Sequence, residues 1–251
     1  MPPEASVVRK NIVIAEGMAH LQLLDKPAII TTCAHLAEHF TERVLEKYSH
    51  SDELHLVFER YDIPLSLKSA TRVRRQGDQH PVYYRITDSS NTAEVTMKRL
   101  LSQEKPKMEL TDRTSVVVAC GNNCQGTHRN VIYPRSTLEE ANTKMMLHAI
   151  DTASKGATQI NFYSPDTNVF ILSLRRYAEL CDDVQLVTAT GQRHRVIILK
   201  SIVQALGSKK LQHYLALILR VAPTSQVALL VKERPLVGRY SRKQVKRPSL
   251  P

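Results

Sequence analysis

The chain has 251 residues, 42% of them hydrophobic, so it can bury one sizeable core but hardly two full domains. Its formal net charge of +11 is unevenly spread: from residue 208 onward there are ten Lys or Arg and a single acid, Glu233. The body is therefore close to neutral, and the charge of the whole chain is weak support for nucleic-acid binding.

The number of cysteines and the hydropathy of the chain exclude further classes of protein. Four cysteines and a polar start without a signal peptide predict a reducing, intracellular compartment and no disulfides. Cys120 and Cys124 have no second Cys or His pair at the same spacing, so we expect no zinc site. No apolar run approaches the eighteen or so residues of a membrane span. We expect a soluble protein with no membrane partner and no small-molecule cofactor.

Strand and helix patterns alternate along the body, which predicts an α/β fold with a mostly parallel central sheet and helices on both faces. In chain order we predict a strand at 11–15, a helix at 31–48, a strand at 54–58, a basic helical segment at 68–75, a short helix at 92–103, a strand at 115–119, a helix at 138–154 ending at Gly156, a strand at 159–163, a helix at 166–177, two strands at 184–187 and 195–199, and a last helix ending at Gly207. Residues 1–10 form an N-terminal tail, 11–207 the domain, and 208–251 a disordered basic tail.

Acidic residues follow or flank the predicted strand ends. They are Glu16, Glu59, the pair Glu139 and Glu140 at the start of a helix, and Asp166 between a strand and a helix. In an open α/β sheet the carboxyl ends of the strands face one crevice. Acids gathered there repel one another unless a cation joins them, and Mg²⁺ or Mn²⁺ prefers such oxygen ligands.

Structural roles also account for each acid singly. Thr137 with Glu140 has the spacing of a capping box, and Asp166 is a good N-cap for the next helix. Glu59 and the neighbouring Arg60 could form a surface ion pair, which would contribute little to stability. Spacing alone leaves both interpretations open.

At these residues the chain resembles the PIN-like, flap-endonuclease-type nuclease superfamily, and within it uncharacterised animal proteins associated with mobile elements. The family shows Asp-Gly-Met-Ala, Phe-Asp-Arg-Tyr-Asp, Glu-Glu-Ala-Asp-Thr and Ser-Pro-Asp-Thr-Asp-Val. This chain has Glu16-Gly17-Met18-Ala19, Phe58-Glu59-Arg60-Tyr61-Asp62, Glu139-Glu140-Ala141-Asn142-Thr143 and Ser164-Pro165-Asp166-Thr167-Asn168-Val169. Pro64, Ser66-Leu67-Lys68 and Thr71-Arg72 match as well, and the similarity runs from about residue 12 to residue 207.

The resemblance implies a metal-dependent phosphodiesterase acting on DNA or RNA, in which an acidic pocket binds two divalent ions. Glu140 and Asp166 are the catalytic positions that match the family outright. The metal positions are Glu16, Glu59, Glu139, Glu140, Asn142, Asp166 and Asn168. Backbone phosphates of the nucleic acid would be approached by Lys68, Arg72, Arg74 and Arg75, although an ordinary basic helix face explains them equally well.

The chain departs from this pattern within the site. Asn142 and Asn168 stand where the family has aspartates, which removes two negative charges and weakens metal binding. Glu16 and Glu59 replace aspartates with a side chain one methylene longer, whereas catalytic geometry tolerates displacements of only about 0.5 Å. We therefore expect a degenerate nuclease fold, impaired or inactive in cleavage. The alternatives are an active Mg²⁺-dependent, structure-sensitive nuclease and a non-catalytic protein-interaction module.

Two departures concern architecture. The family carries a further helix where this chain has only residues 109–114 before the next strand, which shortens the crossover. After about Leu215 the similarity stops, and a family segment with a further metal ligand is missing. Suitable codons for 217–239, read in another frame, give that segment, so residues 216–251 fit an out-of-frame extension. The predicted fold is a truncated PIN-like domain.

Overall fold

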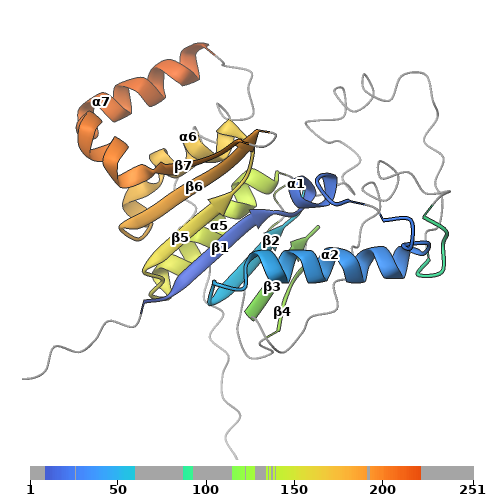
Figure 1. Cartoon of the computed structure of the whole chain (residues 1–251). Coiled ribbons are helices and arrows are strands. Elements are labelled where there is room, and N and C mark those ends of the chain that lie inside the picture. The colour runs from blue at the N-terminus through green and yellow to red at the C-terminus, as the bar shows by residue number, and fades with distance from the viewer. Residues whose placement is uncertain are drawn as a thin grey trace, which may run out of the picture.

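A seven-stranded mixed sheet organises the part of the chain that the structure describes, and helices cover both of its faces (Figure 1). The structure is a computed structural model that describes residues 9–25, 27–59, 87–92, 115–121, 123–127, 134, 136, 138, 140–190 and 193–221. The strand order is β4-β3-β2-β1-β5-β6-β7. Neighbours from β3 to β6 run parallel, while β4 and β7 pair antiparallel at the two edges. The predicted α/β class with a mostly parallel sheet is confirmed.

The elements follow one another in the order expected of strand-helix-strand units. They are β1 (Asn11–Glu16), α1 (Gly17–Gln22), α2 (Cys33–Lys47), β2 (Glu53–Val57), β3 (Ser115–Cys120), β4 (Asn123–Gly126), α5 (Ala141–Ser154), β5 (Gln159–Tyr163), α6 (Thr167–Arg175), η1 (Tyr177–Glu179), β6 (Asp183–Thr190), β7 (Arg193–Ile198) and α7 (Leu199–Val221). The central strand β1 sets the register, since Ile12 lies opposite Glu53 of β2 and Ile160 of β5.

Two apolar clusters lie on opposite faces of the sheet because successive strand residues point to opposite sides. Ile12 and Ile14 of β1 face a cluster built with α5, α6 and α7. Val13 and Ala15 face a smaller cluster built with α1 and α2. All four of these β1 side chains are fully buried, as a strand covered on both faces requires. Figure 1 shows α2 in front of the sheet and α5 behind it.

Two cysteines, Cys120 and Cys124, lie on the edge hairpin of β3 and β4. Cys124 pairs with Ala119 across the two strands. Cys124 packs against the α5 cluster, whereas Cys120 packs against the α2 cluster on the other face. Their side chains therefore point to opposite sides of the sheet.

A buried histidine pair ties β2 to α5 across the core. The Nδ1 atoms of His55 and His148 are 2.7 Å apart, and His55 Nε2 lies 2.6 Å from Glu53 Oε1. If the Nε2–H of His55 donates to Glu53, its Nδ1 accepts from the Nδ1–H of His148. Burial, then the neighbouring His55 and the lysines Lys144 and Lys155, hold the pKa of His148 well below its usual value.

The predicted boundaries of β1, β2, β3 and β5 hold to within one residue, whereas β6 is longer than the predicted 184–187 and β7 begins before the predicted 195. The helix α1 and the edge strand β4 were not predicted, because one is a single turn and a half and the other is a polar Asn-Cys-Gln-Gly run. Helix α5 begins at Ala141 with Glu140 as its N-cap, so the capping box of Thr137 with Glu140 is wrong in register. Asp166 does cap α6, accepting from the backbone N–H of Asn168, as predicted.

The C-terminal helix continues past the predicted end of the domain. Gly207 adopts φ +66° and ψ 162°, a non-helical conformation that suits glycine, so the helical segment that begins at Leu199 ends there, as predicted. A second helical segment follows this kink and runs to Val221, in the region predicted as a disordered tail from residue 208. Leu211 packs against the α5 cluster and Leu215 is 7% exposed, so burial of an apolar stripe extends the helix. Residues 222–251 lie outside the described part.

Several predictions fall on residues outside the described ranges. These are the basic helix at 68–75, nearly all of the helix at 92–103, the shortened connection at 109–114 and the N-terminal tail up to residue 8. None of the helices that the structure describes is long and apolar enough to cross a membrane.

Candidate functional site at the carboxyl edge of the sheet

The strand order reverses between β1 and β5, at the carboxyl ends of the parallel strands. From β1 the chain builds β2 and β3 on one side, then β5 and β6 on the other. Ligands of open α/β sheets bind outside the strand ends at such a switch point. Glu16 is the last residue of β1, and Ser164 and Asp166 follow directly after β5. The topology thus places two predicted site residues on adjacent central strands.

A buried serine connects these two acids. Ser164 is 3% exposed, and its hydroxyl donates a hydrogen bond to Glu16 Oε2 at a distance of 2.6 Å. Ser164 Oγ also accepts a hydrogen bond from the backbone N–H of Asp166, at 3.1 Å. Ser164 therefore links the Glu16 carboxylate to the backbone of the turn that starts α6, where Asp166 lies. The sequence analysis did not single out Ser164, although the serine immediately after a strand and two residues before an N-cap was a usable signal.

Asn142 and Asn168 both donate to Asp166. Asn142 Nδ2 of α5 lies 2.7 Å from Asp166 Oδ2. The amide of Asn168 contacts the same Oδ2 over 3.4 Å, and its backbone N–H donates to Oδ1 over 2.8 Å. Both carboxylate oxygens of Asp166 therefore accept N–H groups of the chain itself. Hydrogen bonds to an ionised carboxylate are among the stronger ones in proteins and satisfy its charge.

A lysine that the sequence analysis missed lies at the same edge. Lys144 of α5 is 2% exposed, and its Nζ donates to the carbonyls of Phe58 and Gly121 over 3.3 and 2.9 Å. These carbonyls lie just beyond the ends of β2 and β3. The signal available was its position four residues after Glu140, a spacing that brings side chains together on a helix. The buried Lys144 ammonium therefore lies at the same edge of the sheet as the acidic residues.

Two further predicted site residues lie at the carboxyl edge of the sheet. Glu140, 5% exposed, is the N-cap of α5, and Glu59 is half-buried two residues beyond β2. Outside the described residues are the predicted metal ligand Glu139 and the predicted phosphate contacts Lys68, Arg72, Arg74 and Arg75. The interpretation of Asp166 as an N-cap is confirmed alongside its place in the network.

The side chains at this edge, as the structure arranges them, do not provide the oxygen ligands of a divalent-metal centre. Mg²⁺ and Mn²⁺ require several converging oxygen ligands, and here Asn142 and Asn168 turn their N–H groups toward Asp166. Within the described ranges, no group of three or more His, Cys, Asp or Glu is placed to hold a metal ion. Metal binding by this chain stays a prediction, and Glu139 would have to contribute from outside those ranges.

Comparison of the chain with protein families, with curated proteins and with solved structures gave no significant match.

Proposed function

We propose that the chain is a degenerate PIN-like nuclease-fold protein, impaired in metal-dependent cleavage of DNA or RNA. One observation carries the proposal: Asn142 and Asn168 satisfy the Asp166 carboxylate with N–H donors at the switch point of the sheet. A site built to hold metal would turn oxygens toward a cation there. In this chain hydrogen bonds within the protein take the place of metal coordination.

The charges at the edge support the same conclusion. Aspartates at 142 and 168 would bring three carboxylates together around Asp166, which is unfavourable unless a cation neutralises them. With asparagines at 142 and 168, Asp166 carries the one negative charge among these three positions, and N–H groups of the chain satisfy it. The Lys144 ammonium is buried between two strand-end carbonyls at the same edge of the sheet. The fold is retained while the electrostatic need for metal is reduced.

Restoring the two aspartates tests the proposal. Mn²⁺ would be titrated calorimetrically into the full chain and into Asn142→Asp/Asn168→Asp, and cleavage of a labelled branched DNA and of a single-stranded RNA measured on the same samples. We expect the double variant to bind Mn²⁺ at least about tenfold more tightly, because each added carboxylate supplies charge and an oxygen ligand. We expect no metal-dependent cleavage by the unaltered chain.

A matched variant separates site effects from overall charge. Asn91→Asp adds a carboxylate at an exposed position outside the network and should leave Mn²⁺ binding unchanged. Equal binding by the double variant and the unaltered chain would argue against this placement of the site. Micromolar Mn²⁺ binding with metal-dependent cleavage by the unaltered chain would instead establish an active nuclease.

A further inference from the structure

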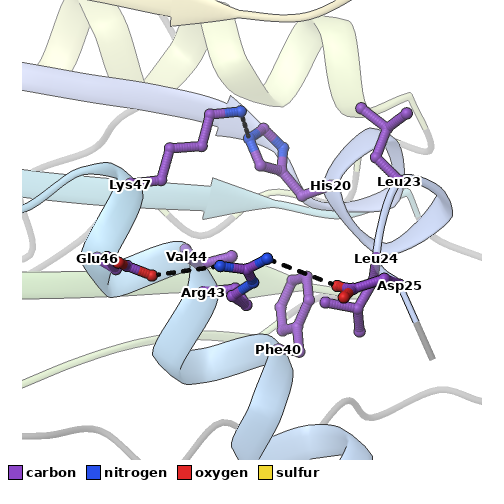
Figure 2. A pocket seen from close by; sticks show the side chains of 9 residues that line it. All are labelled: His20, Leu23, Leu24, Asp25, Phe40, Arg43, Val44, Glu46 and Lys47. Carbon is purple, nitrogen blue, oxygen red and sulfur yellow. Dashed lines mark hydrogen bonds and ion pairs between the residues drawn. The ribbon is translucent and has the colours of Figure 1, made fainter. Parts of the chain in front are cut away.

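A pocket lies on the α2 face of the sheet, between α1, the turn that follows it, and α2 (Figure 2). It has a volume of about 310 Å³. Its apolar wall is formed by Leu23, Leu24, Phe40 and Val44, and its polar rim by His20, Asp25, Arg43, Glu46 and Lys47. An apolar wall with a few convergent polar groups is the usual composition of a small-molecule site.

The two cations of the rim differ in their partners. Figure 2 shows Arg43 between Asp25 and Glu46, at 3.9 and 3.5 Å, so its charge is already compensated. Lys47 instead extends toward His20, with its Nζ 3.4 Å from Nε2. Across the described ranges, no carboxylate lies within ion-pair distance of Lys47. Of these two cations, only Lys47 has its charge open to an anion from outside.

His20 cannot supply the missing negative charge or compete as a cation. Its Nδ1 lies 3.0 Å from the carbonyl of Glu16, an arrangement in which Nδ1–H donates, so Nε2 is left as an acceptor for Tyr48 and Lys47. Burial, together with the Lys47 charge, lowers the pKa of His20 to about 4, and the ring is neutral at pH 7. The Lys47 ammonium thus stands beside a neutral ring.

The surroundings of Lys47 also hold its ammonium in place. Its Nζ lies 5.4 Å from the ring centroid of Tyr48 and 5.7 Å from that of Tyr163, within cation–π range. Partial burial lowers the pKa of Lys47, because the charged form loses hydration that no carboxylate replaces. An anionic group at the rim would restore that stabilisation.

We propose that this pocket binds a compact apolar molecule carrying one anionic group, with the anion at Lys47 and the apolar part against Leu24, Phe40 and Val44. The volume sets the size of the ligand. A water molecule occupies about 30 Å³ of liquid, so 310 Å³ holds about ten non-hydrogen atoms. The proposal is independent of the carboxyl-edge site and of its metal chemistry.

A charge series on the unaltered full chain tests it. Octanoate, octan-1-ol and octylamine share one apolar tail and differ only in the head group, and each would be titrated calorimetrically at pH 7. We expect octanoate to bind at least about tenfold more tightly than octanol, and octylamine most weakly, as a charge-assisted contact with Lys47 predicts. Equal affinities across the series, or no binding of octanoate, would overturn the proposal without any variant.

Two variants then assign the anion contact. Lys47→Met keeps the length of the side chain but removes the charge, and should weaken octanoate binding about tenfold while leaving octanol binding unchanged. Lys200→Met removes a cation that lies outside this pocket and should leave octanoate binding unchanged. No loss in the Lys47 variant, or an equal loss in the Lys200 variant, would contradict the assignment to Lys47.

Discussion

The contact between Asn142 and Asp166 makes a strong prediction about stability. Asn142 is 5% exposed and donates to Asp166 over 2.7 Å. Asn142→Asp removes a hydrogen bond to a charged group, worth about 1.5–3 kcal/mol, and places a second carboxylate in its position. Two unit charges about 4 Å apart repel by about 4 kcal/mol at an effective dielectric constant near 20. One carboxyl of the pair can take up a proton, which relieves part of the repulsion, so the total loss is smaller than the sum of these two terms. We expect the variant to lose about 3–5 kcal/mol of unfolding free energy at pH 7.

Urea denaturation of the unaltered chain and the variant at pH 7 and pH 5, without metal, measures this loss. The like charge raises the folded-state pKa of the carboxyl pair, so the folded variant gains a proton as the pH falls and its deficit should shrink at pH 5. Saturating Mn²⁺ at about 100 times its dissociation constant should recover about 2.7 kcal/mol.

Asn142→Leu provides the control, because it removes the donor without adding charge. It should cost about 1–3 kcal/mol, and that cost should not respond to Mn²⁺. If Asn142→Asp unfolds at the same urea concentration as the unaltered chain at pH 7 without metal, the two side chains are not adjacent and the reasoning about the site fails.

Three further predictions follow from buried contacts. Gly17→Ala should cost about 1–3 kcal/mol in urea denaturation, because an added Cβ would lie 2.3 Å from the buried ring of Phe58. Lys144→Met should raise Mn²⁺ affinity in the aspartate-restored double variant, since it removes a nearby positive charge, as calorimetry would reveal. His148 should make the unfolding free energy fall by up to about 1.4 kcal/mol per pH unit below pH 6.5. The reason is that the unfolded histidine takes up a proton there, whereas the folded one, with its lowered pKa, does not. The variant His148→Gln should show a shallower fall.

Each of these has an outcome that would contradict it. The cost of Gly17→Ala should nearly vanish in a Phe58→Ala background, and an unchanged cost would point away from the ring contact. Unaltered Mn²⁺ affinity after removal of Lys144 would mean that its charge is screened from the metal position. An equally steep loss of stability below pH 6.5 in His148→Gln would assign the acid sensitivity to other groups, His20 among them.

The sequence by itself determined the elements whose signal is local. The buried strands β1 and β3 contain short runs of apolar, mostly β-branched residues, and such runs predict a strand from composition alone. Gly156 ends α5 with φ +90°, and Asp166 caps α6, because both effects depend on a few consecutive residues. The placement of acids just after strand ends was equally readable from spacing.

The tertiary structure alone decided which groups meet. The polar strand β4 exists only because β3 offers it an edge, and the helix beyond Gly207 persists because Leu211 and Leu215 find an apolar surface. The sequence shows asparagine at 142 and 168, but not whether the amides present oxygen to a cation or N–H to a carboxylate. That choice depends on Asp166, 24 residues from Asn142 along the chain and 2.7 Å away in the fold. Long-range contacts of this kind arise from the sheet order, which no local pattern specifies.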